Sequence, residues 1–114
     1  MKIAVIESRD FDNRRLLSEV LIEYLPQITF LISGGCRGAD KMAEEWAIAH
    51  SIPTLIFEPN WAAYGKSAGV MRSKEIIDNY DLCIAFWDGL CKGTSNGIRY
   101  CRKRNKPCKV YYAI

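Results

Sequence analysis

The stretch that decides the fold is Ser33-Gly34-Gly35-Cys36-Arg37-Gly38-Ala39-Asp40. It follows a run of β-forming residues, 28–32, and leads directly into a helix-forming segment, 41–50. Glycines at such a strand-to-helix turn let backbone N–H groups approach an anion, and the helix dipole adds partial positive charge. Arg37 lies within the turn, where its guanidinium can hold two oxygens at once. The stretch therefore indicates either a phosphate-binding loop or a tight turn that binds no ligand.

Strand-like and helix-like segments alternate along the whole chain. The apolar β-forming runs cover residues 2–6, 28–32, 53–57, 82–87 and 109–113. Helical spacing of apolar residues predicts helices over about 12–24, 41–50, 70–79 and 94–104. Continuous apolar runs between helices indicate parallel strands that are covered on both faces. We predict a single α/β domain over residues 1–114, with a three-layer Rossmann-like fold of about five parallel strands and helices on both faces.

The composition limits the classes of protein to which this chain can belong. Apolar residues make up 49% of the 114 residues, which excludes a disordered chain. The longest apolar stretches are only as long as strands, so we expect no membrane span, and the N-terminus shows no secretion signal. The five cysteines form no C-x-x-C pair. We therefore predict a reduced, cytoplasmic protein without a disulfide framework and without a metal site.

The positive charge is concentrated near the C-terminus. The net charge is +3, and one group of cations lies within residues 99–114: Arg99, Arg102, Lys103, Arg104, Lys106 and Lys109. Such a cluster is typical of nucleic-acid binding. Cations also gather at a helix C-terminus, where the helix dipole favours them. Both interpretations stay open, and we favour a solvated helix face.

The loops that follow the predicted strands contain the candidate site. In an open parallel sheet, ligands bind beyond the carboxyl ends of the strands, near the point where the strand order reverses. Glycines, hydroxyls, cations and helix N-termini at that edge suit a phosphate group. The predicted ligand-binding residues are Ser8, Arg9, Gly34, Gly35, Arg37, Gly38, Asp40, Lys66, Gly93, Thr94 and Ser95.

Aromatic and acidic residues in the same loops complete the predicted pocket. Phe11, Trp61 and Tyr64 are candidates for stacking on a base, although Trp61 and Tyr64 can equally cover the edge of the sheet. Asp10 or Asp88 can accept hydrogen bonds from a ribose. We therefore expect a phosphorylated nucleoside or a nucleotide-sugar as the ligand.

Four other residues have structural interpretations. Trp46 falls on the apolar stripe of its helix and is expected in the core, and His50 lies near the helix end, where we expect a surface or capping role. Asp40 can be no more than a favourable charge in a first helical turn. Cys36 lies in an electropositive turn, but no histidine near it in the sequence can serve as its base.

In their order along the chain, these loops resemble those of YspA-like proteins. The matching segments are 8–11, 33–40, 61–66, 68–72, 86–89 and 93–98. YspA-like proteins belong to the SLOG superfamily, the Rossmann-like group that also contains the DNA-processing protein DprA and the LOG phosphoribohydrolases. The resemblance implies a nucleotide-binding sensor linked to prophage or stress systems, and a homodimer formed by helix packing. Arg72 resembles the arginine of LOG proteins and joins the phosphate-binding residues on that ground.

Three functions are compatible with these observations. We favour a binding module for a nucleotide-like ligand, with no other cofactor. The second is a hydrolase that cleaves the N-glycosidic bond of a nucleoside monophosphate. LOG enzymes follow Gly-Thr with acidic residues that segment 95–97 lacks, so the catalytic candidates are Asp10, Asp40, Asp88 and Arg72. The third is a DprA-like nucleic-acid binder that uses the C-terminal cations.

Overall fold

The fold was analysed on a computed structural model, which describes residues 1–7, 11–33, 39–56, 61–65, 78–90 and 92–112. Its strands are β1 (Lys2–Glu7), β2 (Phe30–Ser33), β3 (Thr54–Ile56), β4 (Leu82–Trp87) and β5 (Cys108–Tyr112). They form one parallel sheet in the order β3-β2-β1-β4-β5. The central register aligns Ala4 of β1 with Ile32 of β2 and with Cys83 of β4.

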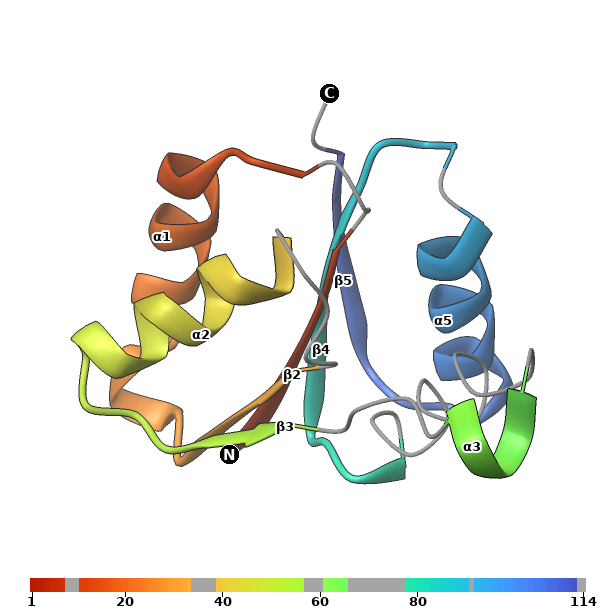
Figure 1. Cartoon of the computed structure of the whole chain (residues 1–114). Coiled ribbons are helices and arrows are strands. Elements are labelled where there is room, and N and C mark those ends of the chain that lie inside the picture. Colours follow the sequence, from red (N-terminus) through yellow and green to blue (C-terminus); the bar gives the residue numbers. More distant parts are fainter. Residues whose placement is uncertain (8–10, 34–38, 57–60, 66–77, 91, 113–114) are drawn as a thin grey trace.

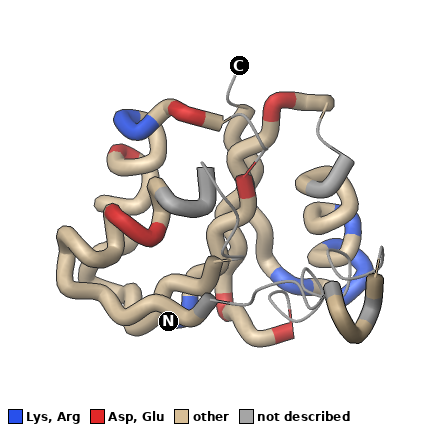
Figure 2. Tube along the Cα trace, viewed as in Figure 1, with Lys and Arg blue, Asp and Glu red and all other residues tan. Residues whose placement is uncertain are grey.

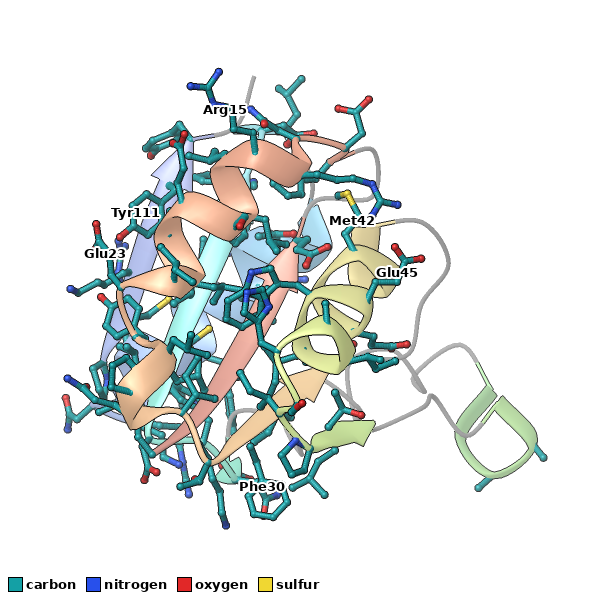
Figure 3. The ribbon with its side chains drawn as sticks, turned by 90° about the vertical axis from the view of Figure 1, so that its left-hand side faces the viewer. Arg15, Glu23, Phe30, Met42, Glu45 and Tyr111 are labelled. Atoms are coloured by element: carbon teal, nitrogen blue, oxygen red, sulfur yellow. The ribbon has the colours of Figure 1, made fainter. Side chains whose placement is uncertain are left out.

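Helices cover both faces of this sheet, as Figure 1 shows. The helices α1 (Arg14–Ile22) and α2 (Ala39–Ala49) lie on one face, and α5 (Lys92–Lys103) lies on the other. The three-layer Rossmann-like fold expected from the sequence is therefore confirmed. Figure 3 looks onto the face with α1 and α2, where an exposed ion pair between Arg14 and Glu45 (2.7 Å) joins the two helices.

The helix ends differ from the predicted ones for local reasons. Asn13 caps α1, because its side-chain oxygen accepts a hydrogen bond from the backbone N–H of Leu16 (3.0 Å). Pro26 follows in a separate 3₁₀ helix, Leu25–Gln27, where its missing N–H is tolerated. A short helix, α3 (Trp61–Tyr64), lies where the sequence analysis assigned no helix. The helix predicted over 70–79 lies largely outside the described residues.

The core consists of two layers, one on each face of the sheet. Ile3 and Val5 of β1 belong to the larger layer under α1 and α2, and the alternate residues Ala4 and Ile6 belong to the smaller layer under α5. Strands that are buried on both faces explain why the sequence shows continuous apolar runs instead of alternation. Among the aromatic residues whose side chains the structure describes, Phe86 of β4 is the most buried, and it lies in the larger layer.

Trp46 in α2 and His50, directly after α2, have their expected structural roles. Trp46 is 7% exposed and belongs to the larger core layer. The His50 ring stacks on Trp46 with 4.2 Å between centroids, and its Nδ1 lies 2.8 Å from the carbonyl oxygen of Trp46, so it caps the end of the helix. None of the helices in the described part of the chain is long and apolar enough to cross a membrane.

Candidate functional site

The strand order reverses between β1 and β4. From β1 the chain proceeds outward to β2 and β3, then crosses to β4 and proceeds outward to β5. The carboxyl ends of β1 and β4 lie side by side, because Glu7 is the register partner of Phe86. In open parallel sheets this reversal point leaves a crevice beyond the strand ends, where ligands bind. The candidate site therefore lies beyond Glu7 and Trp87, at the upper edge of the sheet in Figure 1.

Two helix N-termini face this edge from opposite sides of the sheet (Figure 1). The helix α2 begins at Ala39, directly after the glycine-rich stretch, and α5 begins at Lys92. Thr94 in the first turn of α5 is 5% exposed, and Ser95 is half-buried. Helix N-termini carry partial positive charge and unpaired N–H groups, so both can attract an anion.

A glycine brings α5 close to the central strand. Gly97 is buried, and a Cβ atom added to it would lie 3.0 Å from Cδ1 of Ile6 in β1. This distance is shorter than an ordinary van der Waals contact, so a side chain here requires Ile6 or α5 to shift. The absence of a side chain at Gly97 therefore permits the close approach of α5 to β1.

Most of the predicted phosphate-binding residues cannot be located. Asp40 falls in the first turn of α2, as expected, and Gly93 falls in the first turn of α5, both on the basis of backbone position. The following predicted site residues lie outside the described ranges: Ser8, Arg9, Asp10, Gly34, Gly35, Arg37, Gly38, Lys66 and Arg72.

Carboxylates that sequence reasoning missed lie at the carboxyl edge. Glu7 ends β1 on the same face as Ile3 and Val5, and both of its carboxylate oxygens are buried. Ser33, which opens the glycine-rich stretch, is 1% exposed and donates a hydrogen bond to Oε1 of Glu44 in α2 (3.1 Å). The sequence did contain a signal for Glu7. It is a charged residue at the end of an apolar strand, and it alternates with residues that face the core, so a buried carboxylate could have been predicted.

Asp88 has a structural role in the turn after β4. Its Oδ1 accepts a hydrogen bond from the backbone N–H of Leu90 (2.8 Å). The intervening Gly89 has a φ of +86°, a conformation that favours glycine. The sequence predicted Asp88 to be a ribose-binding or a catalytic residue. One of its two carboxylate oxygens is instead used in a hydrogen bond that stabilises the turn.

The predicted base-stacking residues do not gather at the carboxyl edge. Phe11 is 6% exposed, and its ring stacks on Phe86 with 4.8 Å between centroids, so it fills the core instead of an open pocket. Trp61 and Tyr64 belong to α3, which Figure 1 places toward the opposite, amino end of the sheet. Their position after β3 in the sequence predicted the carboxyl edge, whereas α3 lies toward the amino end.

The C-terminal cations surround the far end of α5, as Figure 2 shows. Three of them are held by neighbouring groups. Arg104 pairs with Asp78 (3.4 Å), the Nζ of Lys106 donates to the carbonyl oxygen of Tyr80 (3.3 Å), and the Nζ of Lys109 donates to the hydroxyl of Tyr24 (2.6 Å). Arg102 and Lys103 lie in the last turn of α5, where the helix dipole favours cations. These contacts agree with the interpretation as a solvated helix face.

Three thiols form a separate cluster on the α5 side of the sheet. The sulfur atoms of Cys83, Cys101 and Cys108 lie within 4.8 Å of one another, and all three cysteines are free. Hydrogen bonds from the Cys108 and Cys83 thiols lower the pKa of Cys101, and the same bonds to Cys101 raise the pKa of Cys83 and of Cys108. Burial raises the pKa of the neighbouring Tyr80 hydroxyl far above its usual value, and Cys101 adds to that rise.

The sheet order, the reversal point between β1 and β4 and the helices on both faces together define a Rossmann-like α/β protein. The family model of the YspA, cpYpsA-related SLOG family matches residues 1–64. This chain therefore belongs to that family. It is also 29% identical over 115 residues to the Gene 61 protein of Mycobacterium phage D29, an alignment that covers 93% of this chain and 92% of the phage protein. No solved structure matches the chain significantly.

Proposed function

We propose that this protein binds a nucleotide or a nucleotide-derived ligand at the carboxyl edge of its sheet, as a sensor or regulatory module in the cytoplasm. The observation that carries the proposal is the strand order, which creates the reversal point between β1 and β4. Two helix N-termini flank that point, and Thr94 and Ser95 supply hydroxyls in the first turn of α5. Membership of a SLOG family and a relative encoded by a phage are consistent with a nucleotide sensor associated with prophages.

Arginines provide the charge in this proposal. The carboxyl edge carries the carboxylates of Glu7, Asp88 and Glu44. These carboxylates would repel a phosphate, so the partial charges of the helix N-termini are not sufficient to bind it. We therefore assign the countercharge to Arg37 in the glycine-rich stretch and to Arg72.

The test is stabilisation of the purified chain by ligand. Nucleoside 5′-monophosphates with each of the four common bases are added singly, and the unfolding temperature is measured. A ligand at 100 times its Kd stabilises the native state by about 2.7 kcal/mol.

We expect Arg37→Ala and Arg72→Ala to abolish this stabilisation, while Arg102→Ala, at the far end of α5, preserves it. Loss of stabilisation in Arg102→Ala alone would contradict the proposal. Native mass spectrometry of the fresh protein identifies any ligand that copurifies.

A second candidate function is hydrolysis of the N-glycosidic bond of such a nucleotide. The observation that favours it is the buried carboxylate of Glu7 at the end of the central strand, a group of the kind that can stabilise an oxocarbenium-like centre or activate water. Chromatography after incubation with each nucleotide would show free base. We expect Glu7→Gln to abolish that release while ligand-induced stabilisation persists; release that is unchanged in Glu7→Gln would exclude this role.

A further inference from the structure

Three cysteines from separate elements meet on the α5 face of the sheet. Cys83 is the second residue of β4, Cys108 is the first residue of β5, and Cys101 lies in α5. Their sulfur atoms all lie within 4.8 Å of one another. Cys83 and Cys101 are fully buried, and Cys108 is half-buried. Because Cys83 and Cys108 lie at the amino ends of their strands, this cluster is separate from the carboxyl edge.

The spacing of the sulfurs suits a shared metal ion better than a disulfide. With metal–sulfur bonds of about 2.3 Å, two sulfurs on one ion lie roughly 3.8–4.0 Å apart. A disulfide requires sulfurs about 2.0 Å apart and Cβ atoms about 3.5–4.5 Å apart. Cys83 and Cys108 are register partners on neighbouring strands, and side chains at such positions follow the strand spacing of about 4.8 Å. A bridging ion therefore requires a smaller movement of the Cys83 and Cys108 side chains than a disulfide between them does. The ion also binds all three thiols, whereas a disulfide leaves the third thiol unbound.

A tyrosine beside the thiols indicates that the cluster receives a further group. Tyr80 is 3% exposed, and its hydroxyl oxygen is buried. The partner beside this hydroxyl is the thiol of Cys101 in the smaller core layer. A thiol is a weak hydrogen-bonding group, and a buried hydroxyl that has only a weak partner often marks an ion or a water in native proteins. An ion held by the thiols, or a water bound to it, gives this hydroxyl a stronger partner.

A cation next to the cluster compensates for the charge of a thiolate site. Three thiolates leave a net charge of −1 around Zn²⁺ and −2 around Cu⁺. The ammonium of Lys106 lies 5.0 Å from the centroid of the Tyr80 ring and is held there by the carbonyl oxygen of Tyr80. A positive charge over the ring of the neighbouring Tyr80 lowers the free energy of such an anionic complex.

We propose that Cys83, Cys101 and Cys108 bind one thiol-preferring metal ion, Zn²⁺ or Cu⁺, with the Tyr80 hydroxyl as a further polar group. This differs from the sequence-based expectation of no metal. Thiolates select these soft ions over Mg²⁺ and Ca²⁺. Each metal–sulfur bond forms as one thiol releases its proton to solvent, so loading releases up to three protons and needs no oxidant or reductant. The ion joins β4, β5 and α5, and it stabilises the fold whether or not the carboxyl edge binds a nucleotide.

The experiment uses the full chain without a histidine tag, purified under reducing conditions. Separate samples are incubated with Zn²⁺ or Cu⁺, freed of excess metal, and examined by native mass spectrometry and thermal unfolding. The variants are Cys101→Ser, Cys108→Ser and Tyr80→Phe. Cys36→Ser is the matched control, since Cys36 is not one of the three proposed ligands. Circular dichroism reports whether each variant folds, and the half-buried Cys108→Ser decides the test if Cys101→Ser does not fold.

We expect the wild-type chain and Cys36→Ser to retain one ion, with an unfolding temperature that a chelator lowers. Cys101→Ser and Cys108→Ser should bind more than about tenfold more weakly, and Tyr80→Phe about tenfold more weakly, as loss of an outer partner does in other metal sites. The metal that survives competition with the chelator identifies the ion. Failure of the wild-type chain to retain either ion, equal retention by Cys108→Ser, or a disulfide among these cysteines in freshly purified protein would overturn the proposal.

Discussion

The amino edge and the carboxyl edge of the sheet differ in what their side chains do. At the amino edge they tie neighbouring segments together: Asp81 accepts a hydrogen bond from the backbone N–H of Lys2 (2.8 Å), and Thr29 donates to the carbonyl oxygen of Met1 (3.0 Å). At the carboxyl edge, Asn13, Asp88 and Ser33 instead hold turns and the starts of helices. Polar side chains thus join separate segments at one edge and fix local turns and helix starts at the other.

The charges are distributed unevenly over the two edges. Figure 2 shows Lys and Arg gathered at the lower end of α5, toward the amino edge, and also at the upper start of α1, where Arg14 and Arg15 lie. The amino edge also carries the carboxylates of Asp78 and Asp81. The described part of the carboxyl edge carries the carboxylates of Glu7 and Asp88. The comparison teaches that a basic cluster in the sequence does not mark the proposed nucleotide site. In the proposed function, helix N-termini and the loop arginines Arg37 and Arg72 would supply the positive charge instead.

The largest effect is expected from the core beneath the carboxyl edge. Phe86 is fully buried and its ring stacks on Phe11 (4.8 Å) and on Tyr111 (5.8 Å). Phe86→Ala should lower the free energy of unfolding by about 3–5 kcal/mol, because it leaves a cavity between the two rings. Leu90→Ala, at a position that is 85% exposed in the same region, should change it by less than about 0.5 kcal/mol. Urea unfolding measures the free energy of unfolding of both variants. A similar decrease in Phe86→Ala and Leu90→Ala would mean that this half of the sheet is not rigidly packed.

The next effect concerns the close approach of α5 to β1. Gly97→Leu should destabilise the protein by about 1–3 kcal/mol, because the new side chain meets Cδ1 of Ile6. Asn96→Leu is the control on the same helix, since Asn96 is exposed. Adding Ile6→Ala should restore part of the free energy of unfolding that Gly97→Leu removes. If the decrease in the double variant equals the sum of the decreases in the two single variants, Ile6 and Gly97 do not determine the position of α5.

A smaller effect is expected at the cap of α1. Asn13→Ala removes the side-chain acceptor of the Leu16 N–H and should lower the free energy of unfolding by about 1 kcal/mol. Asp12→Ala, one residue earlier, serves as the control because Asp12 contributes only its backbone carbonyl to the turn. If both variants lose the same stability by thermal unfolding, the cap does not set the start of this helix.

The smallest effect is a change in the alkaline pH dependence of stability. Burial raises the pKa of Tyr111 above its value in the unfolded chain, and the nearby Tyr24 adds to the rise. A raised pKa means that the folded state holds this proton more tightly, so stability falls as the pH rises through about 10. Tyr111→Phe should make this decline less steep. Tyr112→Phe is the matched control at a position that is 65% exposed, and an equal change in both variants would exclude burial as the cause.

The alternation of apolar runs and helical periodicities was sufficient to predict the fold. Strands buried on both faces require continuous apolar sequence, and helices between them require parallel pairing, so local pattern and global topology are coupled here. The helical periodicity also predicted that Trp46 lies in the core, and the position of His50 near the helix end predicted a surface or capping role, of which the structure shows capping. The order of the loops was sufficient to indicate the family, because each strand end has its own glycine, hydroxyl or aromatic signature.

Only the tertiary structure decided which distant residues meet. Cys83, Cys101 and Cys108 have no metal-binding spacing along the chain, yet strand register and one turn of α5 bring their sulfurs together. The Phe11 ring is buried because Phe86 offers it a stacking partner across the core, which periodicity cannot reveal. Local sequence determines which backbone conformation is favourable and which side chains are apolar. Contacts between separate elements depend on how those elements pack, and that is settled only when the whole sheet forms.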